Sequence, residues 1–110
     1  MGLEEAHVAD TAHEGFTEGT RLLLDGYVDQ AVEELQSAAL LDGGSHPSIN
    51  YNLALAYAGL GQHDAALDQL RWLVNSGHDR ARLLALQTYF DLREGTYSGP
   101  TTIQDDLAGI

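Results

Sequence analysis

The chain has 110 residues, a length that suits one small domain with an economical hydrophobic core. Its residues are 44% hydrophobic and 20% charged, as in a folded soluble domain, and no apolar run is long enough to span a bilayer. Seventeen acidic residues face five arginines and no lysine, a formal net charge of −12, so we expect no binding to nucleic acid.

The chain has no cysteine, which excludes disulfides and thiolate metal sites. Its N-terminal stretch lacks the basic start and the apolar segment of a secretory signal, so we expect a cytoplasmic location and no membrane partner. Two explanations of the acidity stay open. It is either a solubility surface, as in salt-adapted (halophilic) proteins, or a means of attracting a basic partner.

Five helices are predicted from hydrophobic periodicity and helix stop signals. Residues 1–10 are expected to form a flexible N-terminus, and residues 96–110 a C-terminal tail. Between them, helices are expected at about 11–24, 28–41, 47–60, 64–75 and 80–94. Glycines stand just past these runs, where a left-handed backbone ends a helix, at Gly26, Gly43, Gly44, Gly61, Gly77 and Gly95.

A repeat of about 35 residues underlies these helices. The segment GYVDQAVEEL, residues 26–35, matches GQHDAALDQL, residues 61–70, at its glycine, an aspartate, an alanine and the final leucine. A third copy starts with the helical run before Gly95, but Pro100 stands where its second helix needs a small residue, and proline inside a helix costs about 3 kcal/mol. We therefore expect the third unit to keep only its first helix, as a cap.

The order and spacing of these residues resemble the tetratricopeptide repeat (TPR), a helix-turn-helix unit of about 34 residues. The matching residues of the second unit are Leu53, Ala54, Tyr57, Gly61, Ala66 and Leu70, and those of the first are Gly19, Gly26, Ala31, Leu35 and Ala38. Asn50 and His78 stand where the family pattern has tryptophan and proline.

The resemblance implies an all-α fold, namely a short right-handed α-solenoid of antiparallel helix pairs. Such pairs pack closely only where side chains are small, so Ala54 and Ala66 are the expected contact points of the second pair. The implied TPR domain covers residues 11–95, with units at about 11–45 and 46–79 and a C-terminal capping helix at about 80–94.

In proteins of this family the first helix of each pair lines a concave groove that usually holds a peptide. Carried over position by position, the expected peptide-groove residues are Phe16, Thr20, Tyr51, Asn52, Leu55, Arg82 and Tyr89. This wall is aromatic and aliphatic, so the resemblance implies an apolar peptide or helix as the ligand. The alternative is that ordinary packing, or the chain's own tail, takes up these side chains.

Trp72 is the expected second interface, because it falls at a helix position that the family normally exposes and tryptophan is enriched at interfaces. Two occupants stay open: the apolar residues of the tail, or a second copy of the chain in a homodimer.

No catalytic motif is present in the sequence, so we expect no enzymatic activity, no cofactor and no metal. The five histidines have no spacing that sets two of them on one helix face as ligands. The leading hypothesis is a non-catalytic protein–protein interaction module, a scaffold for a protein or peptide partner. The alternatives are a homo-oligomerising scaffold element and a small dedicated chaperone of a secreted or assembling protein.

The net charge of −12 generates a prediction about salt. If the acidic surface is that of a salt-adapted protein, added salt screens the repulsion between carboxylates, and the melting temperature should rise between about 0.1 and 1 M NaCl. Thermal melting followed by circular dichroism measures this. A melting temperature that is indifferent to salt would contradict the halophilic interpretation.

Overall fold

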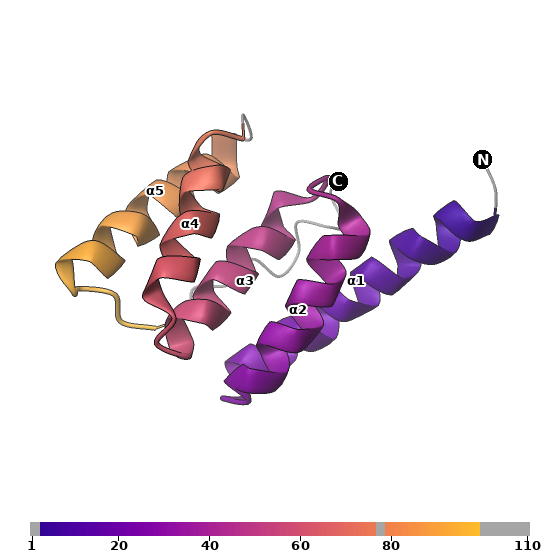
Figure 1. Ribbon diagram of the computed structural model, residues 1–110, viewed down its shortest axis with the longest axis horizontal. Helices are drawn as coiled ribbons and strands as arrows, with labels where there is room; N and C mark the ends of the chain where they lie inside the picture. The colour runs from indigo at the N-terminus through magenta and orange to yellow at the C-terminus, as the bar shows by residue number, and fades with distance from the viewer. Residues whose placement is uncertain (1–2, 77–78, 100–110) are drawn as a thin grey trace.

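The computed structural model describes residues 3–76 and 79–99, and this part of the chain is all-α, as predicted (Figure 1). No helix of this part combines the length and the hydrophobicity that crossing a membrane requires. The helices are α1 (Leu3–Leu24), α2 (Val28–Asp42), α3 (Pro47–Gly59), α4 (His63–Val74) and α5 (Asp79–Glu94).

The observed bounds of α2 to α5 agree with the predicted bounds to within one residue at each end. The N-terminus differs. α1 begins at Leu3 rather than at about residue 11, so residues 3–10, expected to be flexible, are helical. The stretch LEEAHVAD contains several strong helix formers and no glycine or proline to stop the helix. In Figure 1 this end of α1 projects beyond the other helices.

One carboxylate organises the turn between α2 and α3. Gly43 ends α2 with a left-handed φ of 66°, and its N–H donates to the carbonyl of Ala39 at 3.0 Å. The carboxylate of Asp42 then accepts a 2.7 Å hydrogen bond from the backbone N–H of His46 and also contacts the His46 ring. Pro47 starts α3, where its missing N–H is not needed.

Each helix packs on the next one in the chain, and α3 also contacts both α1 and α5. α3 therefore lies in the middle of the array and touches all four other helices. The molecule is elongated accordingly, with principal extents of 46, 30 and 21 Å (Figure 1).

The central position of α3 explains its sequence, PSINYNLALAYAG, which contains no charged residue. Its buried residues run almost without a break from Pro47 to Ala56, because neighbouring helices cover it on several sides. α2 and α4 instead bury a single face, at the spacing i, i+4, i+7. The buried residues are Ala31, Leu35 and Ala38 on α2, and Ala66, Leu70 and Leu73 on α4, which are equivalent positions of the sequence repeat.

Small residues let α1 and α2 approach closely. A Cβ atom added to Gly19 would lie 2.6 Å from Cγ of Leu35, and one added to Gly15 would lie 3.1 Å from Cβ of Ala38. Both distances are shorter than an ordinary carbon–carbon contact of about 3.5–4.0 Å. In the second pair, the expected contact residues Ala54 and Ala66 are both completely buried.

Replacing Gly19 by valine tests the close approach of α1 and α2. The added side chain would meet Leu35, which is completely buried and has no room to move aside. We expect the free energy of unfolding to fall by about 1–3 kcal/mol, the usual cost of overpacking a core. Urea unfolding followed by circular dichroism measures this.

Thr17→Val is the matched control, because it places valine on the exposed face of the same helix. Its effect should stay within about 0.5 kcal/mol. If Gly19→Val is no more destabilising than this control, the two helices are not packed as closely as the distances indicate.

Candidate functional site

The structure places five of the seven predicted groove residues in the interior. Phe16 and Thr20 on α1, and Tyr51, Asn52 and Leu55 on α3, are all buried. These side chains therefore do not line an open groove. Their burial agrees with the alternative that the sequence left open, in which these side chains pack within the chain itself.

Two of these buried side chains join α3 to its neighbours on either side. Asn52 donates from Nδ2 to Oγ1 of Thr20 on α1 at 3.0 Å. The hydroxyls of Tyr51 and of Thr88 on α5 share a hydrogen bond of 2.9 Å. Burial raises the pKa of Tyr51, so its hydroxyl stays neutral at physiological pH. One turn of α3 is thus bonded to both α1 and α5.

After α5 the chain turns back toward the Tyr51–Thr88 hydrogen bond. Tyr97 packs against the core and, with Ser98 and Gly99, lines a hollow of about 190 Å³ that Tyr51 and Thr88 also line. Burial raises the pKa of Tyr97 to about 12. The first residues of the predicted 96–110 tail therefore lie against α3 and α5, and residues 100–110 are outside the described residues.

The other two predicted groove residues, Arg82 and Tyr89, lie on α5, where Arg82 is exposed and Tyr89 half-buried. The guanidinium carbons of Arg71 on α4 and Arg93 on α5 lie 6.0 and 5.7 Å from the centre of the Tyr89 ring. Both are within the reach of about 6 Å that cation–π attraction requires. Hydrogen bonding from Arg71, and to a lesser extent from Arg93, lowers the pKa of Tyr89, because these bonds favour the phenolate.

α5 also carries an exposed apolar stripe that the sequence reasoning missed. Leu83, Leu86 and Phe90 are 63%, 39% and 50% exposed, and their spacing of i, i+3 and i+7 sets them on one face. The opposite face of α5 is buried and is made of Ala81, Ala85, Thr88 and Leu92. The sequence signal that could have revealed the stripe is this second set of large apolar residues, on a helix whose core-facing side chains are mostly small.

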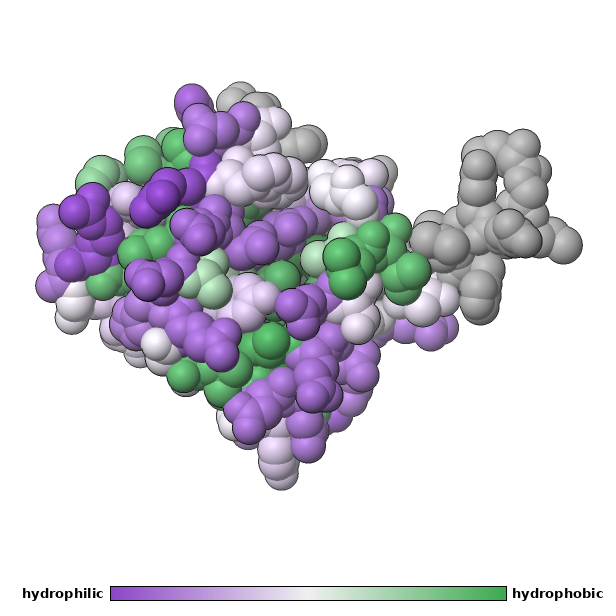
Figure 2. Space-filling view, viewed as in Figure 1, coloured by the Kyte–Doolittle hydropathy of each residue, from purple (hydrophilic) through white to green (hydrophobic). Residues whose placement is uncertain are grey.

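Hydrophobic and strongly hydrophilic side chains lie side by side at the end of the molecule formed by α4 and α5, on the left of Figure 2. The Tyr89 and Phe90 rings contribute to this surface and meet edge to face, with their centres 5.8 Å apart. We name the stripe of Leu83, Leu86 and Phe90, together with Arg82, Tyr89 and Arg93 beside it, the α5 surface.

Trp72, the predicted second interface, is 45% exposed and rests on the loop between α2 and α3. A Cβ atom added to Gly44 in that loop would lie 3.3 Å from the Trp72 ring, so the ring covers bare glycine backbone. Of the apolar tail residues that were candidates to cover Trp72, Tyr97 packs against the core and the others lie outside the described residues. The homodimer contact stays a prediction.

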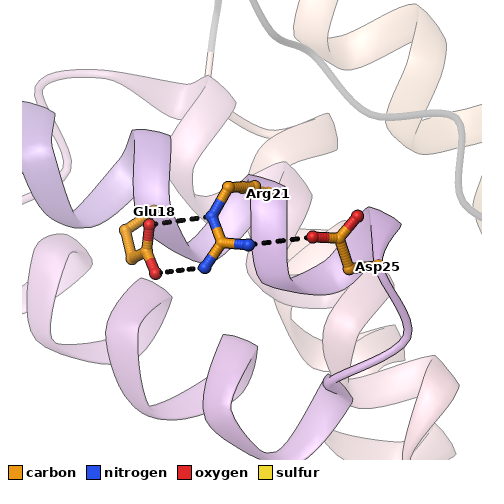
Figure 3. Close-up of polar contacts among 3 residues, drawn as sticks. All are labelled: Glu18, Arg21 and Asp25. Carbon is orange, nitrogen blue, oxygen red and sulfur yellow. Dashed lines mark hydrogen bonds and ion pairs between the residues drawn. The ribbon is translucent and has the colours of Figure 1, made fainter.

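Arg21 is already neutralised on α1 (Figure 3). Its Nε and Nη2 donate to the two carboxylate oxygens of Glu18 at 3.0 and 2.6 Å, and its Nη1 donates to Asp25 at 2.9 Å. The paired guanidinium holds the pKa of Glu18 below its usual range. Arg21 is therefore a poor candidate for binding a further anion.

Among the side chains that the structure describes, those of residues 11–76 and 81–99, no three histidine, aspartate or glutamate groups lie close enough together to hold a metal ion. Comparison of the chain with models of known protein families, with curated proteins and with solved structures gives no match.

A double-mutant cycle tests the Asn52–Thr20 hydrogen bond. Thr20→Val keeps the shape of the side chain but removes the acceptor for a buried amide, so the free energy of unfolding should fall by about 1–3 kcal/mol. Combining it with Asn52→Leu should cost less than the sum of the single changes, by about 0.5–3 kcal/mol. Urea unfolding measures all four proteins, and strictly additive effects would show that the bond does not couple α1 to α3.

Proposed function

We propose that this chain is a non-catalytic protein–protein interaction module that binds an apolar segment of another protein. The observation that carries the proposal is the exposed stripe of Leu83, Leu86 and Phe90. A surface helix normally turns its apolar residues toward the core. α5 has such a face, and the stripe is a second apolar face on its other side. Grouped apolar residues of this kind mark interaction sites, whereas scattered ones do not.

We therefore place the binding surface on the outer face of α5 and not in the expected groove. Phe16, Tyr51 and Leu55 are buried, and a ligand would have to displace them from the core to use them. Arg82 and Tyr89 stay in the site, because they lie on α5 beside the stripe.

The scaffold in this proposal is a short TPR-type solenoid of two helix pairs and a capping helix. Its support is the packing of each helix on the next, together with the equivalent buried triplets of α2 and α4. We place the module in the cytoplasm as part of the same proposal.

The two ends of the array differ in a way that favours a partner at α5. Helices that end a repeat array need a polar outer face to remain soluble. Within residues 11–24, the exposed residues of α1 are mostly polar, namely His13, Glu14, Thr17, Glu18 and Arg21, with Leu24 at the end of the helix. α5 instead exposes two leucines and a phenylalanine, which a bound segment would cover.

The test is affinity capture from the cells that produce the protein, followed by mass spectrometry. Leu83→Ser with Phe90→Ser disrupts the stripe at exposed positions, so the fold should persist. Leu40→Ser is the matched control, because Leu40 is 80% exposed on α2, away from α5. Burying one such side chain contributes about 1.5–3 kcal/mol, so the stripe variant should lose a specific partner at least about tenfold.

Partners that the wild type and the Leu40→Ser control retain, and that the stripe variant loses, would support the proposal. Equal capture by all three proteins would place the binding surface elsewhere. Sedimentation at several concentrations tests the homo-oligomer alternative. If the wild type self-associates and the stripe variant does not, the partner is a second copy of this chain.

A further inference from the structure

The charges of this acidic chain are unevenly distributed along the array. α2 contains four acidic residues and no basic one, Asp29, Glu33, Glu34 and Asp42. α5 contains as many arginines as acidic residues, with Arg80, Arg82 and Arg93 against Asp79, Asp91 and Glu94. Among the described arginine side chains, only Arg21 lies outside α4 and α5, and Glu18 and Asp25 neutralise it (Figure 3).

Arg82 and Arg93 follow one edge of the apolar stripe. With Tyr89 between them they fall at i, i+7 and i+11, which sets all three on the same side of α5. Arg71 of α4 reaches the Tyr89 ring on the same edge. It also makes a long ion pair of 3.6 Å with Asp68 on its own helix. Both Arg71 and Arg93 lie within cation–π reach of the Tyr89 ring.

In the described part of the chain, neither Arg82 nor Arg93 forms an ion pair. With seventeen acidic residues available, arginines without a carboxylate partner are a feature that needs a cause. Asp91, on another side of α5, instead accepts a 3.2 Å hydrogen bond from the Thr96 hydroxyl.

We infer that the α5 surface binds an acidic amphipathic helix. This inference rests on the proposed function. The apolar face of the partner helix packs on Leu83, Leu86 and Phe90, whose helical spacing matches helix-against-helix packing. Carboxylates at the border of that face meet Arg82 and Arg93, whose planar guanidinium groups suit paired hydrogen bonds to carboxylates.

A second copy of α5 packed antiparallel to the first fits this surface less well. In a twofold antiparallel pair of identical helices, each edge meets the same edge of its partner. Arg82 and Arg93 of one copy would then face the same two arginines of the other, and like charges across an interface disfavour association. A separate acidic helix avoids this repulsion.

Two synthetic helical peptides with the same leucine face test the inference, one bordered by glutamates and the other by lysines. Binding of each dye-labelled peptide to the full chain is measured by fluorescence anisotropy in about 0.15 M NaCl, where the Debye length of about 8 Å limits the influence of distant charges. We expect the glutamate peptide to bind about tenfold more tightly than the lysine peptide. The net charge of −12 alone would favour the lysine peptide, so this order would show that the local arginines dominate.

The variant Arg82→Gln with Arg93→Gln should lose this preference, with a fall of about tenfold in affinity for the glutamate peptide. Arg21→Gln is the matched control, because it removes an arginine that intrahelical carboxylates already neutralise, and it should leave both affinities unchanged. In about 1 M NaCl the preference of the wild type should also disappear.

The outcomes separate the inference from the proposed function. Equal binding of both peptides, or tighter binding of the lysine peptide, would overturn the acidic partner. If Leu83→Ser with Phe90→Ser then abolishes binding, the apolar docking surface of the proposed function still stands. If neither peptide binds the wild type, both are overturned. Equal losses in the Arg82/Arg93 variant and in Arg21→Gln would reduce the effect to net charge and would also overturn the inference.

Discussion

Two consecutive side chains of α3 set the geometry on which the rest of the structure depends. Asn52 bonds to Thr20 on α1 and Tyr51 bonds to Thr88 on α5, so the central helix is tied to both outer helices within one turn. Both bonds are buried, and a buried polar group left without its partner costs far more than a made bond contributes. Apolar contacts alone tolerate sliding of helix on helix. These bonds favour one arrangement.

The remainder of the core is compatible with that arrangement because its side chains are small where the helices approach. Gly15 and Gly19 leave room for α2, and Ala54 and Ala66 are completely buried in the second pair. Asn50, which stands where the TPR pattern has tryptophan, donates instead to Gln69 on α4 at 3.2 Å. Polar bonds between helices thus replace part of the bulk that a larger core would supply.

This compact interior also determines where a partner is able to bind. The residues of the expected groove are taken up inside the molecule, whereas Leu83, Leu86 and Phe90 form an exposed apolar stripe on α5, at one end of the array. The opposite end differs in character. There α1 exposes mostly polar residues, and its arginine is neutralised by two carboxylates.

The sequence by itself determined the helical class and the bounds of α2 to α5, because glycines, Pro47 and the i, i+4, i+7 spacing are local signals. It did not determine which side chains would be exposed. Tyr51 and Leu55 were expected to line a groove, yet both are buried, and Leu83 and Phe90, which the sequence analysis did not single out, are exposed. Exposure depends on which helices pack against a given face, and that is decided by contacts between residues far apart in the chain, which only the tertiary structure contains.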